Sequence, residues 1–287
     1  MTPDRVRSAI TGMWAWDNSV SPADDERGRG YAPSAPHRLA AYATAGELRE
    51  VYLAAPWAAN EGPVGVWFGQ ACGALRGADV EVSALGGDAT WLADPTLFGR
   101  WLGDAHAAAD FDRVHLDVAP WAGPGWAQDK ATELRGLLML LDLARGAAGD
   151  VPIDVDTPWW LAYEPFADDA SGAPGETTGA TMLDAVLARA DRVSILAFAD
   201  HARGPGGSLA LAARAVSASV AAGRPFTIGV EAAAPESTDG ARYTFFDEGP
   251  VALLREAALV RAALAEQPGY RGVAVAHHRA WRRLLGV

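Results

Sequence analysis

The chain contains one cysteine, few lysines and no long apolar run, and each scarcity excludes a class of protein. Cys72 alone rules out an internal disulfide framework and permits a reducing compartment. No apolar run approaches the roughly 20 residues that a membrane-spanning helix needs, so we expect no membrane partner. The chain has only 24 Lys and Arg residues, compared with 36 Asp and Glu residues. The net charge of −12 argues against nucleic acid as a partner, because phosphate binding needs clustered basic residues.

The first ten residues are charged and polar, without the apolar segment of a secretory signal. Cytoplasmic localisation is therefore the default expectation, and secretion stays open for a chain that has been trimmed. The composition is otherwise rich in apolar residues, since half of the 287 residues are hydrophobic, which is enough for a sizeable core. Eleven tryptophans are the main compositional oddity. The sequence carries no signal for the oligomeric state.

The hydrophobic pattern predicts eight strand–helix units in succession. The predicted strands lie at 8–15, 51–55, 79–85, 113–118, 151–155, 191–197, 225–230 and 272–276, and the helices at 37–50, 63–75, 94–109, 128–147, 178–190, 207–222, 250–266 and 279–285. No change of composition marks a linker, so we expect a single domain over residues 1–287. Eight such units favour a closed (β/α)8 TIM barrel, whose active site lies at the C-terminal face. Several strand-to-helix loops are long and aromatic, in agreement with a site at that face.

The stretch Arg113–Pro120 shows how polar side chains are placed at that face. Apolar residues alternate with His115 and Asp117, and Pro120 ends the strand because it has no N–H to donate. A strand that puts polar side chains on one face just before it stops places them at the rim of the barrel. An Asp that only hydrogen-bonds loop amides would give the same spacing.

Carboxylates and tryptophans recur at the ends of the other predicted strands. The residues expected to bind substrate at this rim are Trp14, Trp16, Asp17, Trp57, Trp121, Asp156, Trp159, Trp160, Asp200, His201 and His277. Indole faces stack on the C–H faces of pyranose rings and carboxylates hold hydroxyls, so the pattern favours a carbohydrate or another small polar substrate. Core packing is the alternative for each tryptophan, and we assign Trp67 and Trp101, inside predicted helices, to packing.

Glu231 is the strongest candidate for catalysis. It is the only acid in the otherwise apolar stretch Thr227–Glu231, and a carboxylate there is costly to bury without partners, so its presence suggests use. A structural ion pair across the barrel mouth is the alternative. Glycosidases usually place two carboxylates across the scissile bond, and Asp117, Asp156 and Asp200 are the other candidates.

The stretch His115-Leu-Asp-Val-Ala-Pro120 resembles the fourth-strand motif of TIM-barrel glycoside hydrolases. Chitinase-like enzymes end that strand in an Asp-x-Glu pair. Clan A retaining enzymes have a Glu-Pro there as acid/base and a seventh-strand Glu as nucleophile. The resemblance, which covers the eight-unit layout and two short motifs, implies that Glu231 is the nucleophile or general base and that Asp117 holds the charge or proton of its neighbour. The acid/base position is Ala119, which cannot donate a proton, so the resemblance implies a severely impaired enzyme.

Three interpretations of Ala119 stay open. The chain carries a Glu→Ala substitution that traps substrate, or it is a natural non-catalytic carbohydrate-binding pseudoenzyme, or another residue such as Asp156 or Asp200 supplies the acid.

A metal-dependent hydrolase is the rival enzyme class. Its possible ligands at strand ends are His115, Asp117, Asp200, His201, Glu231, His277 and His278. No His-x-His closes the first predicted strand, and the adjacent His277 and His278 cannot both point inward along one strand, so we expect no metal site. No glycine-rich phosphate fingerprint follows the first predicted strand either, and we expect no cofactor.

Overall fold

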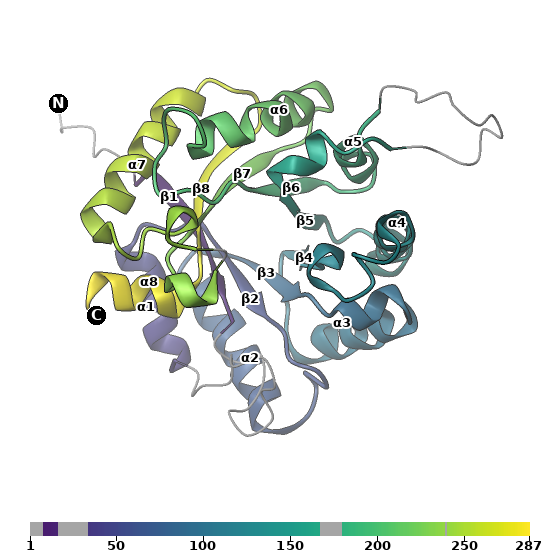
Figure 1. Cartoon of the computed structure of the whole chain (residues 1–287). Coiled ribbons are helices and arrows are strands. Elements are labelled where there is room, and N and C mark those ends of the chain that lie inside the picture. Colours follow the sequence, from purple (N-terminus) through teal and green to yellow (C-terminus); the bar gives the residue numbers. More distant parts are fainter. Residues whose placement is uncertain (1–7, 17–33, 167–179, 239) are drawn as a thin grey trace, which may run out of the picture.

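The computed structural model describes residues 8–16, 34–166, 180–238 and 240–287, and within them eight parallel strands close into a barrel (Figure 1). The strands are β1 Ile10–Ala15, β2 Glu50–Ala54, β3 Glu81–Gly86, β4 Arg113–Leu116, β5 Ile153–Pro158, β6 Arg192–Leu196, β7 Phe226–Glu231 and β8 Tyr270–Ala276. Each strand pairs with its neighbours in sequence, and β8 closes the barrel onto β1. The predicted (β/α)8 TIM barrel, a single domain, is confirmed.

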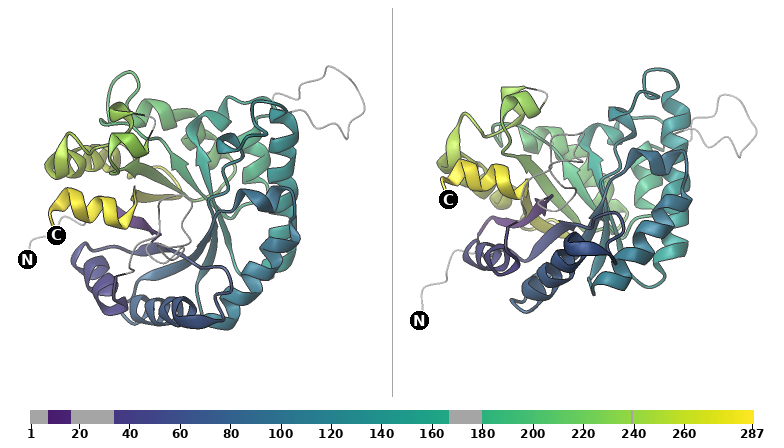
Figure 2. Two further views of the ribbon diagram at one scale, coloured as in Figure 1. Left: turned by 60° about the horizontal axis from the view of Figure 1, so that its bottom comes forward. Right: turned by 90° about the horizontal axis from the view of Figure 1, so that it is seen from below.

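The helices form a ring around the strands in all three views (Figures 1 and 2). They are α1 Pro36–Ala45, α2 Gly62–Arg76, α3 Thr96–Ala108, α4 Lys130–Ala148, α5 Met182–Leu187, α6 Ser208–Ala221, α7 Gly249–Leu264 and α8 His278–Leu285. The segments that lead from strand to helix, such as 197–207 and 232–248, are longer than returns such as 77–80 and 222–225. None of the described helices is both long and apolar enough to span a bilayer.

Local sequence explains where several helices begin and end. The Asp129 carboxylate accepts the N–H of Thr132 (3.0 Å) at the start of α4, and Thr181 forms a reciprocal capping box with Asp184 at the start of α5. The prediction that the first helix extends to residue 50 was wrong. It ends at Ala45 because Gly46 stops it and Glu47 adopts a positive φ of 54°, which turns the chain into β2.

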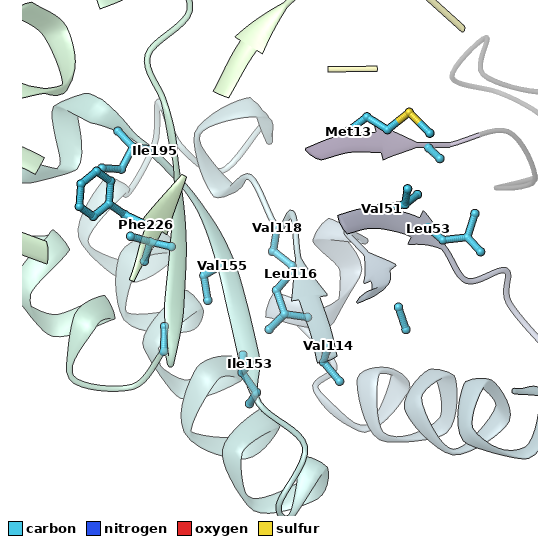
Figure 3. Close-up of a cluster of buried hydrophobic side chains, with 14 of the residues drawn as sticks. Met13, Val51, Leu53, Val114, Leu116, Val118, Ile153, Val155, Ile195 and Phe226 are labelled. Atoms are coloured by element: carbon cyan, nitrogen blue, oxygen red, sulfur yellow. The ribbon is translucent and has the colours of Figure 1, made fainter. Parts of the chain in front are cut away.

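The main apolar core lies between the barrel and the helix ring (Figure 3). Val114, Leu116 and Val118 are at most 1% exposed, which confirms that the apolar positions of the fourth strand face this core. Trp101 is also 1% exposed, so its assignment to packing is confirmed. Trp91 packs against it with ring centroids 5.1 Å apart and is equally buried, although it follows a strand end.

The N-terminal half of the barrel interior is closed by charged side chains. The Arg192 guanidinium donates to the Asp154 carboxylate, with Nε to Oδ2 at 2.9 Å, and to the Glu50 carboxylate. Arg113 Nε donates to the same Asp154 at 2.8 Å, and the Tyr52 hydroxyl donates to Glu50 Oε1 at 2.9 Å. Because Arg192, Asp154 and Glu50 are at most 2% exposed, this cluster is an interior ionic layer beneath the site.

Candidate functional site

A cavity of about 950 Å³ lies at the C-terminal ends of β5, β6 and β7, within the usual size range of ligand sites. Its lining is mostly aromatic and polar: Trp121, Pro158, Trp159, Trp160, Leu196, Phe198, His201, Pro205, Gly206, Leu211, Glu231, Glu236, Ser237, Thr238, Arg242 and Tyr243. Five residues that the sequence predicted at the rim meet here, namely Glu231, His201 and three tryptophans. The elaborated C-terminal face therefore carries the cavity, as in other TIM barrels.

Glu231, the last residue of β7, reaches the cavity with a partly buried carboxyl group. Its Oε1 accepts the backbone N–H groups of Ala232 (2.7 Å) and Ala233 (2.8 Å). Burial raises the pKa of Glu231 to about 7, against the opposing effect of those two N–H donors. Within the described part of the chain no cationic side chain offsets this burial. The carboxyl group can therefore take up or release a proton near neutral pH.

The raised pKa predicts how Glu231→Gln changes stability with pH. The neutral carboxyl favours the folded state, so this contribution is complete below the ordinary glutamate pKa of 4.5 and is lost as the pH rises through about 7. We expect the glutamine variant to match the unchanged chain near pH 4 and to exceed its unfolding free energy by about 1 to 3 kcal/mol above pH 7. Denaturant unfolding of both proteins from pH 4 to 8 measures this difference. An equal difference at every pH would contradict the assignment.

Three tryptophans form one wall of the cavity. Trp121 belongs to the turn Pro120–Ala122 after β4, and Trp159 and Trp160 open the turn Trp159–Ala162 after β5. The Trp121 and Trp160 rings meet edge to face at 5.6 Å, and the Lys130 ammonium lies 5.9 Å from the Trp160 ring centroid. These contacts hold the indoles in place, so the wall is organised before any ligand arrives.

Another part of the lining comes from the loops after β6 and β7. The His201 ring is hydrogen-bonded through Nδ1 to the Asp200 carboxylate, and this bond raises the pKa of His201. Asp200 itself is not in the lining and acts on the cavity through His201. Arg242 stacks over Tyr243 at 4.5 Å, and the Arg242 carbonyl accepts the N–H of Asp200 at 3.1 Å. Sequence reasoning missed Arg242, Tyr243 and Glu236, which lie in a polar loop whose only signal was its length.

The expected rim positions of Trp14 and Asp156 were wrong. Both side chains are 2% exposed and lie inside the barrel, where Trp14 Nε1 donates to Asp156 Oδ2 at 2.8 Å. Asp156 Oδ1 is hydrogen-bonded to His115 Nε2 at 2.8 Å, and the His115 ring stacks on Tyr52 at 4.0 Å. The physical reason is that β5 continues two residues beyond Asp156, to Pro158, so Asp156 lies within the sheet rather than at its end. The Trp14 ring therefore offers no face to a sugar, and Asp156 offers no free carboxylate.

Asp117 and Ala119 follow β4 and are partly buried. The Asp117 N–H donates to the Gly86 carbonyl at 2.9 Å. A Cβ on Gly87 would lie 2.2 Å from the Asp117 carbonyl oxygen, so only glycine permits this close approach after β3. Neither Asp117 nor Ala119 is in the described lining of the cavity.

The remaining predicted residues are dispersed. Trp16 is partly buried against the apolar interior of the barrel. Trp57 follows the end of β2, is 42% exposed, donates to Asp88 Oδ2 at 3.3 Å and is not in the described lining of the cavity. His277 directly follows β8, as expected, and lines a different cavity beyond the loop after β7. Asp17 falls outside the described residues.

The candidate metal ligands are not gathered in one place. His115 is fully buried beside Asp156, and His278 is fully buried against Tyr42, with ring centroids 5.0 Å apart. Over the ranges that the structure describes, no three His, Cys, Asp or Glu side chains are grouped as a metal site. The metal-dependent alternative therefore gains no support from this part of the chain.

Comparisons with known proteins bear on the fold. No protein-family model matches the sequence, and no curated protein matches it. Among solved structures, the spore cortex-lytic enzyme SleL of Bacillus megaterium is similar over 99% of this chain and 75% of its own, at 11% identity and a TM-score of 0.51. The C-terminal domain of Legionella pneumophila ChiA is similar over 96% of this chain and 94% of its own, at 12% identity and a TM-score of 0.50. At such low identity the likeness shows the fold alone.

Proposed function

We propose that this protein is a glycoside hydrolase-like TIM barrel that binds a carbohydrate in the cavity above β5, β6 and β7. The observation that carries the proposal is Glu231, a carboxyl group with a pKa of about 7 that shares its cavity with three indoles. Indoles provide stacking surfaces for sugar rings, and a carboxyl group that titrates near neutrality is suited to proton transfer or nucleophilic attack. The glycoside hydrolase-like fold supports this reading.

In the proposed mechanism Glu231 is the nucleophile or general base of a two-carboxylate reaction. Asp117 would hold the charge or proton of an acid/base group at position 119, two residues further along the chain. Ala119 supplies no proton, so the chain as it stands is expected to bind its sugar with little turnover. Of the two alternative acids that the sequence suggested, Asp156 is held inside the barrel and Asp200 is not in the described cavity lining. Glu236, which the sequence did not suggest, is exposed in that lining.

A non-catalytic carbohydrate receptor is the second candidate function. The same tryptophan wall together with the missing acid favours it, because a receptor needs stacking surfaces and hydrogen bonds but no proton donor. Both candidates require that the cavity binds a sugar.

The experiment that tests sugar binding is a titration of the Trp159→Ala variant. We expect it to bind a neutral oligosaccharide roughly tenfold more weakly than the unchanged chain, because it removes one stacking surface from the cavity. Calorimetric titration with oligomers of glucose, galactose, mannose and N-acetylglucosamine measures the affinities.

Trp57→Ala is the matched control, since it also removes an indole but lies outside the cavity. Its affinity should stay within twofold of the unchanged chain. Equal losses in the two variants, or no saccharide binding at all, would contradict the proposed site.

A further inference from the structure

Trp14 and Glu231 lie at the same level of the barrel. β8 lies between β1 and β7 (Figure 1), and Val275 of β8 is the register partner of both Met13 and Val230. Trp14 and Glu231 are the next residues of β1 and β7, so they stand on either side of β8. Met13 and Val230 belong to the core outside the barrel. Because side chains alternate between the two faces of a strand, Trp14 and Glu231 both point inward.

Small residues make room for the Trp14 indole between β1 and β7. Ala274 and Ala276 are the inward residues of β8 at this level, and they are part of, or packed against, the interior apolar cluster that contains Trp14. On β7, a Cβ on Gly229 would lie only 3.3 Å from Trp14 Cη2, so the missing side chain permits a close approach. The indole therefore crosses β8 and packs against the strand that ends in Glu231.

The same indole lies behind the floor of the cavity that holds Glu231. The Cβ position on Gly229 is also 3.1 Å from Leu196 Cδ2 and 3.4 Å from Phe198 Cε1, and both of these side chains line the cavity. Trp14 itself is 2% exposed and is not in the described lining. It therefore supports this apolar floor from the interior of the barrel.

Hydrogen bonds fix the orientation of the indole. Trp14 Nε1 donates to Asp156 Oδ2 at 2.8 Å, and Asp156 Oδ1 is bonded in turn to His115 Nε2 at 2.8 Å. The Trp14 ring also meets Tyr52 edge to face, with ring centroids 4.9 Å apart. A fully bonded interior network holds its members in one arrangement, so the indole is clamped between β5 and β7.

We propose that Trp14 is the positioning residue of Glu231: its indole, held by Asp156, supports β7 and the cavity floor and keeps water from the inner side of the Glu231 carboxyl group. The inference rests on the proposed function for the task of Glu231 and on the packing of the barrel interior for the task of Trp14.

Burial is the cause that raises the pKa of Glu231 to about 7. Among the described residues, the charged groups that line the same cavity, His201, Glu236 and Arg242, are not among the causes of this shift. A change that admits water beneath Glu231 should therefore lower its pKa, because water stabilises the ionised carboxylate.

The test is a pH titration of the Glu231 carboxyl carbon by NMR in the unchanged chain and in Trp14→Leu, with the signal assigned by its loss in Glu231→Gln. We expect the midpoint to fall from about 7 by at least about one pH unit in Trp14→Leu. Asp156 loses its indole donor in this variant, so water is drawn into the vacated space to replace the hydrogen bond.

Trp101→Leu is the matched control. Trp101 is also a buried indole, its Nε1 donates to the Ala55 carbonyl at 3.0 Å, and it packs on a strand glycine, Gly86, but it belongs to the core outside the barrel. Its midpoint should stay at about 7. An unmoved midpoint in Trp14→Leu, or an equal fall in both variants, overturns the proposal. If Trp14→Leu does not fold, Trp14→Phe beside Trp101→Phe makes the same comparison with a smaller loss of volume.

Titration with the neutral oligosaccharides separates this inference from the proposed function. A fall confined to Trp14→Leu, in a protein whose unchanged chain binds no oligosaccharide, supports the role of Trp14 and refutes the saccharide function. Oligosaccharide binding by the unchanged chain, together with an unmoved midpoint in Trp14→Leu, supports the function and refutes the role of Trp14.

Discussion

Replacing Arg192 by methionine is expected to lower the free energy of unfolding by about 3 to 5 kcal/mol. Arg192 is 2% exposed inside the barrel and is the cation between the carboxylates of Glu50 and Asp154. Methionine fills similar volume but leaves both carboxylates in the interior without this partner. Removing one member of a buried ionic cluster costs more than the cluster contributes, because the remaining charges stay desolvated.

The loss of unfolding free energy in Arg192→Met should depend on pH in a defined direction. Burial alone would raise the pKa of Asp154, but the charges of Arg192 and Arg113 outweigh it and hold that pKa below its usual value. The Asp154 contribution to stability is therefore present above the ordinary aspartate pKa and is lost as the pH falls through the lowered one. In Arg192→Met the carboxylates can be protonated at low pH. The difference in unfolding free energy between the unchanged chain and this variant should therefore become smaller as the pH falls.

Arg189→Met is the matched control for this prediction. Arg189 pairs with Asp142 at 2.8 Å on the surface, where the two side chains are 28% and 60% exposed. A surface pair contributes roughly 0 to 1 kcal/mol, so this variant should unfold at nearly the same denaturant concentration as the unchanged chain. If Arg192→Met cost no more than Arg189→Met, the interior ionic layer would not be a stabilising cluster.

The barrel itself could be predicted from the sequence because its signals are local. Strand stretches of about five apolar residues, helix-period patterns and short returns recur eight times, and each unit can be recognised without knowing its partners. The alternation in Arg113–Leu116 also assigned the two faces of β4 correctly, since side chains change face at every residue.

The interior of the barrel could not be predicted to the same depth. Asp154 and Arg192 are register partners on the neighbouring strands β5 and β6, whereas Glu50 is on β2, and only closure of the sheet brings Glu50 to Arg192. The error at Asp156 has a similar origin, because the exact end of β5 depends on pairing with β6 as far as Pro158 and Leu196. A shift of one or two residues in the end of a strand decides whether a carboxylate there faces the cavity or the barrel interior.

The lining contributed by loops was the least predictable part of the site. Trp159 and Trp160 were found because they directly follow a strand, whereas Arg242 and Tyr243 lie eleven and twelve residues beyond Glu231. Their return to the cavity depends on the path of a loop that has no period in its sequence. Residue type and strand position therefore predicted the side of the cavity formed by the tryptophans and missed the side formed by the loop after β7.

The largest functional effect is expected from Ala119→Glu. This change places a proton donor at the position that the proposed mechanism assigns to the acid/base group, just before the turn that carries Trp121 into the cavity. General acid catalysis contributes about 10² to 10⁴ in rate, so we expect a gain of that size on aryl glycosides of the sugar that binds. Ala122→Glu, which adds a carboxylate at an exposed position in the same turn, should show no gain.

The measurement that tests the proposed mechanism most directly compares the turnover of Ala119→Glu with that of Ala119→Glu/Glu231→Gln on one glycoside that binds. The two-carboxylate mechanism predicts that the first variant gains activity and that the second loses the entire gain, because its nucleophile or base is gone. Activity that persists after Glu231→Gln, or no activity from Ala119→Glu on a sugar that binds, would contradict the role of these two positions.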